Sequence, residues 1–229
     1  MPTCLRDHWH WRPEWRCDRP RYWWYLTFAT ESPLHQVARR FQQHVSGIDS
    51  LDLVPLEWLH LTLQDVGFVH ELAPGQASAL RAAAADAVSD LPALRLALGP
   101  LRTMNSAVVL EAHPTDELVA LRHRLRTALA AVRAPDVPGP VEFHPHVSLA
   151  YVNRECDASD VLDPLRDVPM PTAHVSVGKV TLAAVTRRNR AYRWEPVAEV
   201  PLRGSGRAAD GQEDWAARRT WVFEAPYPS

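Results

Sequence analysis

The chain has 229 residues, of which 46% are hydrophobic and 23% charged, and its formal net charge at pH 7 is −2. This composition predicts a soluble globular protein with one sizeable domain or two small lobes, and the charge excludes a general attraction to nucleic acid or anionic membranes. Three cysteines without a C-x-x-C motif argue against a disulfide framework, and no apolar run reaches membrane-spanning length, so we expect a cytoplasmic protein.

The first segment of the chain, residues 1–20, is rich in Trp, Arg and Pro and has no clear period. We expect it to form an extension on the surface of the main domain, which is predicted to span 21–202. Its tryptophans Trp9, Trp11 and Trp15 should pack onto that domain, because three exposed indoles would favour association.

A strand–helix–strand unit opens the main domain. The aromatic and β-branched stretch YWWYLTFAT (22–30) predicts a strand. The apolar residues of the next segment, 31–45, recur at helical spacing, and EWLHLTLQDVGFV (57–69) is typical of a second strand.

A second unit repeats this order in the other half of the chain. It comprises a strand at 107–112, a helix at 114–132 with Thr115 as the expected N-cap, and a strand at 143–152. The two units are of nearly equal length, and each ends in a strand that carries His-x-Thr/Ser. This repetition predicts two lobes related by a pseudo-twofold axis.

The remaining segments predict additional elements. A helix is expected at 73–90 and a strand at 93–101, followed late in the chain by two strands, 173–186 and 191–202, that form a hairpin. The last residues, 203–229, contain the linker-like GSGRAADGQED and are expected to form a partly flexible tail.

The repeated pair, His60 with Thr62 and His146 with Ser148, lies on strands in which residues i and i+2 share a face. Each pair should therefore point away from a core that takes the apolar residues between them. If the two lobes face each other, the cleft between them holds two imidazoles and two hydroxyls.

That set of groups suits the opening of a cyclic phosphodiester by water. An in-line displacement needs a base beside the attacking water and an acid beside the leaving oxygen, and histidine can fill both roles near neutral pH. The hydroxyls can donate hydrogen bonds to the non-bridging phosphate oxygens, where charge accumulates.

The bare pattern H-x-[S/T] occurs five times, at His44, His60, His113, His146 and His174. His44 and His113 are not followed by an apolar fourth residue. His174, in HVSV, passes that filter but lacks a preceding strand–helix unit, so we interpret it as an ordinary strand histidine.

HLTL and HVSL at this separation, the second within PHVSLAY, resemble the paired motifs of the 2H phosphoesterase superfamily, in the branch of 2′-5′ RNA ligase-like and RNA 2′,3′-cyclic phosphodiesterase proteins. The resemblance covers roughly 21–202. It implies a bilobal, pseudo-twofold α+β fold in which two antiparallel-rich sheets flank a central cleft, with the helices outside. It also implies metal-independent hydrolysis of 2′,3′-cyclic phosphates, on an RNA end or a nucleotide, without a cofactor.

By this resemblance His60 and His146 are the catalytic pair, and Thr62 and Ser148 bind the phosphate. Members directed at RNA often carry an arginine shortly after the second motif, where this chain has Tyr151. We include Tyr151 among the substrate-binding residues, since it could donate its hydroxyl or stack on a base. The alternative, an aromatic residue in the core, is equally compatible with its position.

Three other functions remain open at this point. His144, His146 and His60 could form a zinc or iron site, although no acidic residue lies at a telling distance. The cleft could instead belong to a non-catalytic module that binds a nucleotide or an RNA end, with the aromatic run 22–25 as a stacking surface. An ATP-driven ligase is disfavoured because the chain has no G-x-x-x-x-G-K-[S/T] loop, and 2′-5′ ligation is expected only as the reverse of hydrolysis. We expect a monomer.

Overall fold

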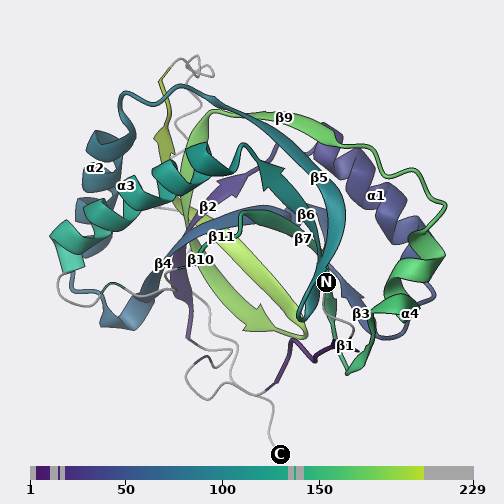
Figure 1. Cartoon of the computed structure of the whole chain (residues 1–229). Coiled ribbons are helices and arrows are strands. Elements are labelled where there is room, and N and C mark those ends of the chain that lie inside the picture. Colours follow the sequence, from purple (N-terminus) through teal and green to yellow (C-terminus); the bar gives the residue numbers. More distant parts are fainter. Residues whose placement is uncertain (1–3, 11–14, 16–18, 134–136, 138–141, 204–229) are drawn as a thin grey trace, which may run out of the picture.

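The structure is a computed structural model of the chain, and it describes residues 4–10, 15, 19–133, 137 and 142–203. The fold belongs to the α+β class, as predicted. Within the described residues, its main feature is a nine-stranded sheet in which all neighbouring strands are antiparallel, and Figure 1 shows that this sheet curls around a concave face with the helices outside.

The sheet has two halves of matching order, β11-β10-β2-β4 and β7-β6-β5-β9. The strands of the first half are β2 (Arg21–Thr27), β4 (His60–Phe68), β10 (Lys179–Arg188) and β11 (Ala191–Pro201). Those of the second half are β5 (Leu94–Met104), β6 (Ala107–His113), β7 (His146–Val152) and β9 (Ala173–Val177). A short strand, β3 (Leu51–Leu53), also pairs with β7.

The two halves form one continuous sheet, which corrects the prediction of two sheets on either side of a cleft. Strands β4 and β7 pair directly, with Leu61 opposite Val147. The strands that carry the two histidine motifs are therefore hydrogen-bonded neighbours. The symmetry of the repeat relates the two halves of one curled sheet, and the concave side of that sheet takes the place of the predicted cleft.

The predicted strand–helix–strand units are present as β2-α1-β4, with β3 inserted before β4, and β6-α3-β7. Helix α1 (Pro33–Val45) packs against β9 and β7, and α3 (Thr115–Arg133) packs against β4 and β6. Helix α2 (Gln76–Val88) lies beside α3 and contacts β11. Helix α1 thus covers strands of the opposite half and α3 covers one strand of each half, and these contacts tie the halves together. Thr115 is the first residue of α3 rather than its N-cap.

The late strands differ from the prediction in one respect. The stretch 173–186 is two strands, β9 and β10, separated at Gly178. They lie in opposite halves of the sheet, because β9 pairs with β5 while β10 pairs with β2 and β11. The hairpin that was predicted for the last two strands is formed by β10 and β11.

The N-terminal residues that the structure describes are packed into the domain. Strand β1 (Cys4–Leu5) pairs with β8 (Cys156–Asp157), which precedes α4 (Ala158–Leu162), and Leu5 is fully buried in the main core. Trp15 is 8% exposed. The expectations for Trp11 and for a flexible tail concern residues outside the described part of the chain, apart from Arg203. In the described part, no helix is long and apolar enough to span a membrane.

Candidate active site

The first histidine motif lies at the start of β4, where the strand alternates between the two faces of the sheet. His60 and Thr62 are half-buried on the concave face, while Leu61 and Leu63, 0% and 2% exposed, enter the core. The apolar neighbours therefore fix which way the motif points, as the period-2 pattern predicts.

The second motif has the same arrangement at the start of β7. His146 and Ser148 are half-buried, while Val147 and Leu149 are buried in the core. Strands β4 and β7 are antiparallel and Val147 is paired with Leu61. In this register His60 lies opposite Ser148 and His146 lies opposite Thr62. The pairing brings the four polar side chains to one place on the concave face.

A cavity of ≈ 680 Å³ is hollowed into this face. All five residues that the sequence singled out line it: His60, Thr62, His146, Ser148 and Tyr151. The volume lies within the range of small-molecule binding sites. The residues predicted from two distant segments thus share one cavity.

The two imidazoles are anchored in the same way. His60 Nδ1 lies 2.7 Å from the carbonyl oxygen of Trp58, and His146 Nδ1 lies 2.6 Å from that of His144. A carbonyl oxygen can only accept a hydrogen bond, so Nδ1 carries the proton in both rings. In the neutral form, Nε2 of each ring is left as a proton acceptor, which is the state that a general base needs.

Both imidazoles have a lowered proton affinity. Burial lowers the pKa of His60 from 6.5 to about 4, the carbonyl of Trp58 opposes this shift, and the neighbouring His146 adds to it. Burial also lowers the pKa of His146, with a smaller contribution in the same direction from His144. Both rings are therefore neutral near pH 7.

A tyrosine accompanies each hydroxyl residue. Tyr25 hydrogen-bonds Thr62 and stacks on the His60 ring, with centroids 4.1 Å apart and an interplanar angle of 19°. Tyr151 hydrogen-bonds Ser148. Burial raises the pKa of both phenols well above the usual value, and the hydrogen bond with the neighbouring hydroxyl opposes this shift only in part, so both stay protonated.

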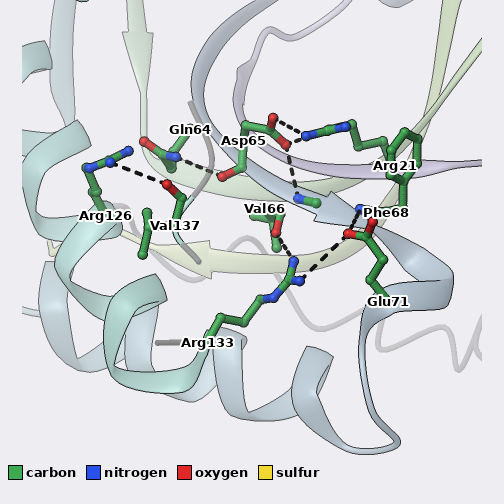
Figure 2. A network of polar contacts seen from close by, with 10 residues as sticks. Arg21, Gln64, Asp65, Val66, Phe68, Glu71, Arg126, Arg133 and Val137 are labelled. Atoms are coloured by element: carbon green, nitrogen blue, oxygen red, sulfur yellow. Dashed lines mark hydrogen bonds and ion pairs between the residues drawn. The ribbon is translucent and has the colours of Figure 1, made fainter. Parts of the chain in front are cut away.

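Arg21 and Asp65 also line the cavity, and the sequence analysis did not identify them. Arg21 donates to the two carboxylate oxygens of Asp65 through Nε (2.8 Å) and Nη2 (2.6 Å), as Figure 2 shows. Strict alternation along β4 would put Gln64, not Asp65, on the face of His60. The pairing of β2 with β4 shifts register between Trp24 and Tyr25, and this irregularity turns Asp65 into the cavity.

A second basic side chain, Arg133 of helix α3, binds the end of strand β4. Arg133 of α3 donates to the carbonyl oxygen of Val66 and lies 3.7 Å from the carboxylate of Glu71, which accepts a hydrogen bond from the Phe68 amide (Figure 2). This network joins α3 to the end of β4 and to the short 3₁₀ turn Val69–Glu71. It fixes the strand that carries His60 without contacting the cavity.

The N-terminal segment contributes two further lining residues, His8 and Trp15. The ring nitrogens of His8 lie 2.9 Å from the Ser106 hydroxyl and 2.9 Å from the Tyr192 hydroxyl, and its ring stacks on Tyr151 at 4.2 Å. One face of Tyr151 is therefore covered by the protein itself. No sequence pattern links a residue at position 8 to strands formed more than 90 residues later.

The metal site that the sequence left open is not assembled. Within the described part of the chain, no group of three or more His, Cys, Asp or Glu side chains is arranged to hold a metal ion. The side chain of His144 is largely exposed and lies 4.0 Å from Glu142. The alternative based on His144, His146 and His60 is therefore not supported by the geometry.

Comparison with solved structures identifies many chains of similar fold. A phosphoesterase superposes with a TM-score of 0.58 at 20% identity, covering 80% of this chain and 98% of that chain. The structure of E. coli LigT in complex with 3′-AMP superposes with a TM-score of 0.60 at 19% identity, covering 81% of this chain and 99% of that chain. The protein TT0787 of Thermus thermophilus superposes with a TM-score of 0.62 at 16% identity, covering 81% of this chain and 99% of that chain. At these identities the likeness establishes the fold.

No curated protein sequence matches the chain. The family model of the 2′-5′ RNA ligase superfamily, in contrast, matches residues 27–189, which include both histidine motifs and most of the curled sheet. The match spans well over half of the chain and agrees with the fold and with the paired motifs. This protein therefore belongs to the 2′-5′ RNA ligase superfamily, a group of 2H phosphoesterases.

Proposed function

We propose that this protein is a metal-independent phosphodiesterase that hydrolyses 2′,3′-cyclic phosphates, on a nucleotide or an RNA end, with His60 and His146 as its acid–base pair. The observation that carries the proposal is the paired construction of the site. Two imidazoles with matching Nδ1 anchors share one cavity, and each lies opposite a hydroxyl residue.

The relatives support nucleotides as the ligand class. Crystal structures of E. coli LigT have been described in complex with 3′-AMP, ATP and NADP+. All three ligands combine phosphate groups with a nucleobase. A nucleoside cyclic phosphate has the same two parts, and the cavity of ≈ 680 Å³ is large enough to hold one.

The proposed reaction is an in-line displacement at phosphorus. Nε2 of one histidine removes a proton from water as the water oxygen bonds to phosphorus. Nε2–H of the other histidine gives a proton to the ribose oxygen whose bond to phosphorus breaks, and the product is a phosphomonoester beside a free hydroxyl. Thr62 and Ser148 donate to the non-bridging oxygens, each oriented by the phenol of its tyrosine.

The environments of the two rings favour His60 as the base and His146 as the acid. The base must be neutral, and burial holds the pKa of His60 at about 4. The acid must be protonated, and an anionic phosphate in the cavity raises the pKa of a nearby imidazole. With a 5′-hydroxyl in place of water, the same displacement opens the ring: the 5′-oxygen bonds to phosphorus, the bond to the 3′-oxygen breaks, and the two RNA ends are joined by a 2′-5′ bond.

The experiment that tests the function is hydrolysis of 2′,3′-cyclic nucleotides and of an RNA end with a cyclic phosphate, in the presence of a strong chelator. We expect turnover by the wild type and identification of one phosphomonoester isomer. His60→Ala should lower kcat/KM by about 10²–10⁴-fold. The control His174→Ala changes the exposed H-x-S of β9 and should leave the rate unchanged.

Two results would refute this function. Loss of activity on chelation would indicate a metal-dependent reaction. A wild type that binds nucleotides without turnover, with affinity retained in His60→Ala, would instead identify a non-catalytic binding module.

A further inference from the structure

His8 and Trp15 of the N-terminal segment line the candidate active site, although both lie outside the part of the chain that the family model matches. Its backbone donates from Arg6 N to Asn105 O and from His8 N to Val152 O, both at 2.8 Å. Leu5 is fully buried in the main core. These contacts hold the segment at the cavity that contains the two histidines.

The segment brings an indole to a cluster of aromatic rings in that cavity. Trp15 stacks on Trp23 with centroids 6.1 Å apart and an interplanar angle of 18°, and lies 5.4 Å from the ring of Tyr192. All three rings line the cavity. The segment thereby extends an aromatic surface that begins on β2.

Two indole N–H groups of this surface lack an acceptor within the part of the chain that the structure describes. The Nε1 atoms of Trp15 and Trp23 are buried and find no hydrogen-bond partner among the described residues. Buried indole N–H groups usually have a partner, and an unpaired one costs free energy. Because both N–H groups are buried, a ligand in the cavity meets the surfaces of these rings and not their N–H groups.

The charges around the cavity favour a small ligand over a polyanion. Among the described lining residues, Arg21 and Asp65 carry full charges, and they neutralise each other in a bidentate ion pair. Binding of a polynucleotide draws much of its free energy from several basic side chains that contact phosphates. Stacking of a base on aromatic side chains does not require such charges.

We propose that Trp15, together with Trp23, forms a nucleobase subsite, which makes the N-terminal segment the element that selects nucleoside 2′,3′-cyclic phosphates over cyclic phosphates without a base. The base stacks on the ring surfaces that line the cavity. This proposal rests on the proposed function of the same cavity.

The test compares two substrates, adenosine 2′,3′-cyclic phosphate and methyl riboside 2,3-cyclic phosphate, which has the same reacting group but no base. In Trp15→Ala, kcat/KM for the nucleotide should fall by about 5- to 100-fold, mainly through KM, whereas the rate for the methyl riboside should stay within about twofold. Trp15→Phe keeps a stacking face without the N–H group and should give an intermediate loss.

Trp9→Ala is the matched control, because Trp9 belongs to the same segment and packs on Tyr192 but does not line the cavity. It should leave the ratio of the two kcat/KM values unchanged. An equal loss for both substrates in Trp15→Ala would assign Trp15 a structural role and overturn the proposal. Equal use of both substrates by the wild type would also overturn it.

A separate measurement covers the case in which the wild type hydrolyses neither substrate, which would refute the proposed function alone. Calorimetry would then compare the binding of adenosine 2′-monophosphate and methyl riboside 2-phosphate. Weaker binding of the nucleotide to Trp15→Ala, by about fivefold or more, would uphold the subsite. Unchanged affinity would overturn it.

Discussion

The two histidine motifs have the same local geometry and different surroundings. At the β4 motif, Tyr25 of the neighbouring strand β2 lies opposite Thr62 and stacks on the motif's own imidazole, His60. At the β7 motif, the nearby tyrosine is Tyr151 of the same strand, which stacks on His8 of the N-terminal segment. The same short motif therefore places its imidazole in two environments, and the environment sets the proton affinity on which an acid–base role depends.

The sharpest test of this difference uses a diester whose leaving group needs no proton. On a 2′,3′-cyclic nucleotide, His60→Ala and His146→Ala should each lower kcat/KM by about 10²–10⁴-fold. On a 4-nitrophenyl phosphodiester, the kcat/KM of His146→Ala should lie within about tenfold of the wild-type value, because the nitrophenolate leaves without needing a proton from an acid. His60→Ala should stay impaired.

If His60→Ala recovers instead, the two roles are exchanged between the motifs. Recovery of neither variant would mean that both imidazoles act in steps other than protonation of the leaving group. Initial rates of nitrophenolate release, measured with a chelator present, distinguish these outcomes.

The hydroxyl residues test whether the two halves share the phosphate. Thr62→Val and Ser148→Ala should each lower kcat by about 10²–10³-fold, since each removes a donor to an oxygen on which charge develops. Ser176→Ala, in the exposed H-x-S of β9, is the matched control. A change of less than about threefold in either variant would exclude that hydroxyl from transition-state binding.

The lowered pKa values of the histidines should also appear in stability. The pKa of His60 is about 4 in the folded protein against 6.5 in the unfolded chain, so the unfolded state binds more protons below pH 6.5. Between pH 7 and 4 this should remove about 3 kcal/mol of unfolding free energy in the wild type but not in His60→Asn.

Urea unfolding of both proteins at pH 7, 5.5 and 4 measures the difference. His146→Asn should also reduce the loss of unfolding free energy at acid pH, since burial lowers the pKa of His146 as well. An equal acid loss in wild type and His60→Asn would show that His60 titrates normally in the folded protein.

The rate–pH profile gives the finest comparison of the two rings. We expect a bell-shaped kcat/KM, which reports the free enzyme, with its maximum between about pH 4 and 6.5. The rate should fall by about tenfold per pH unit on the acid side as His60 becomes protonated, and similarly on the alkaline side as His146 loses its proton. A flat profile between acid and neutral pH would contradict an imidazole pair.

The sequence by itself determined the local elements and the faces of the motif strands. Helical spacing and strand alternation follow from backbone geometry, so the two strand–helix–strand units were predictable, as was the orientation of His60 and His146 opposite their leucine and valine neighbours. The repetition of the motif then indicated that the two segments belong together.

Tertiary structure alone decided how the halves meet and what else lines the cavity. The direct pairing of Leu61 with Val147, the turn of Asp65 toward Arg21, and the approach of Trp15 all depend on contacts between distant segments. Such contacts leave no period or spacing in the sequence, because they depend on how strands pair and shift register rather than on neighbouring residues.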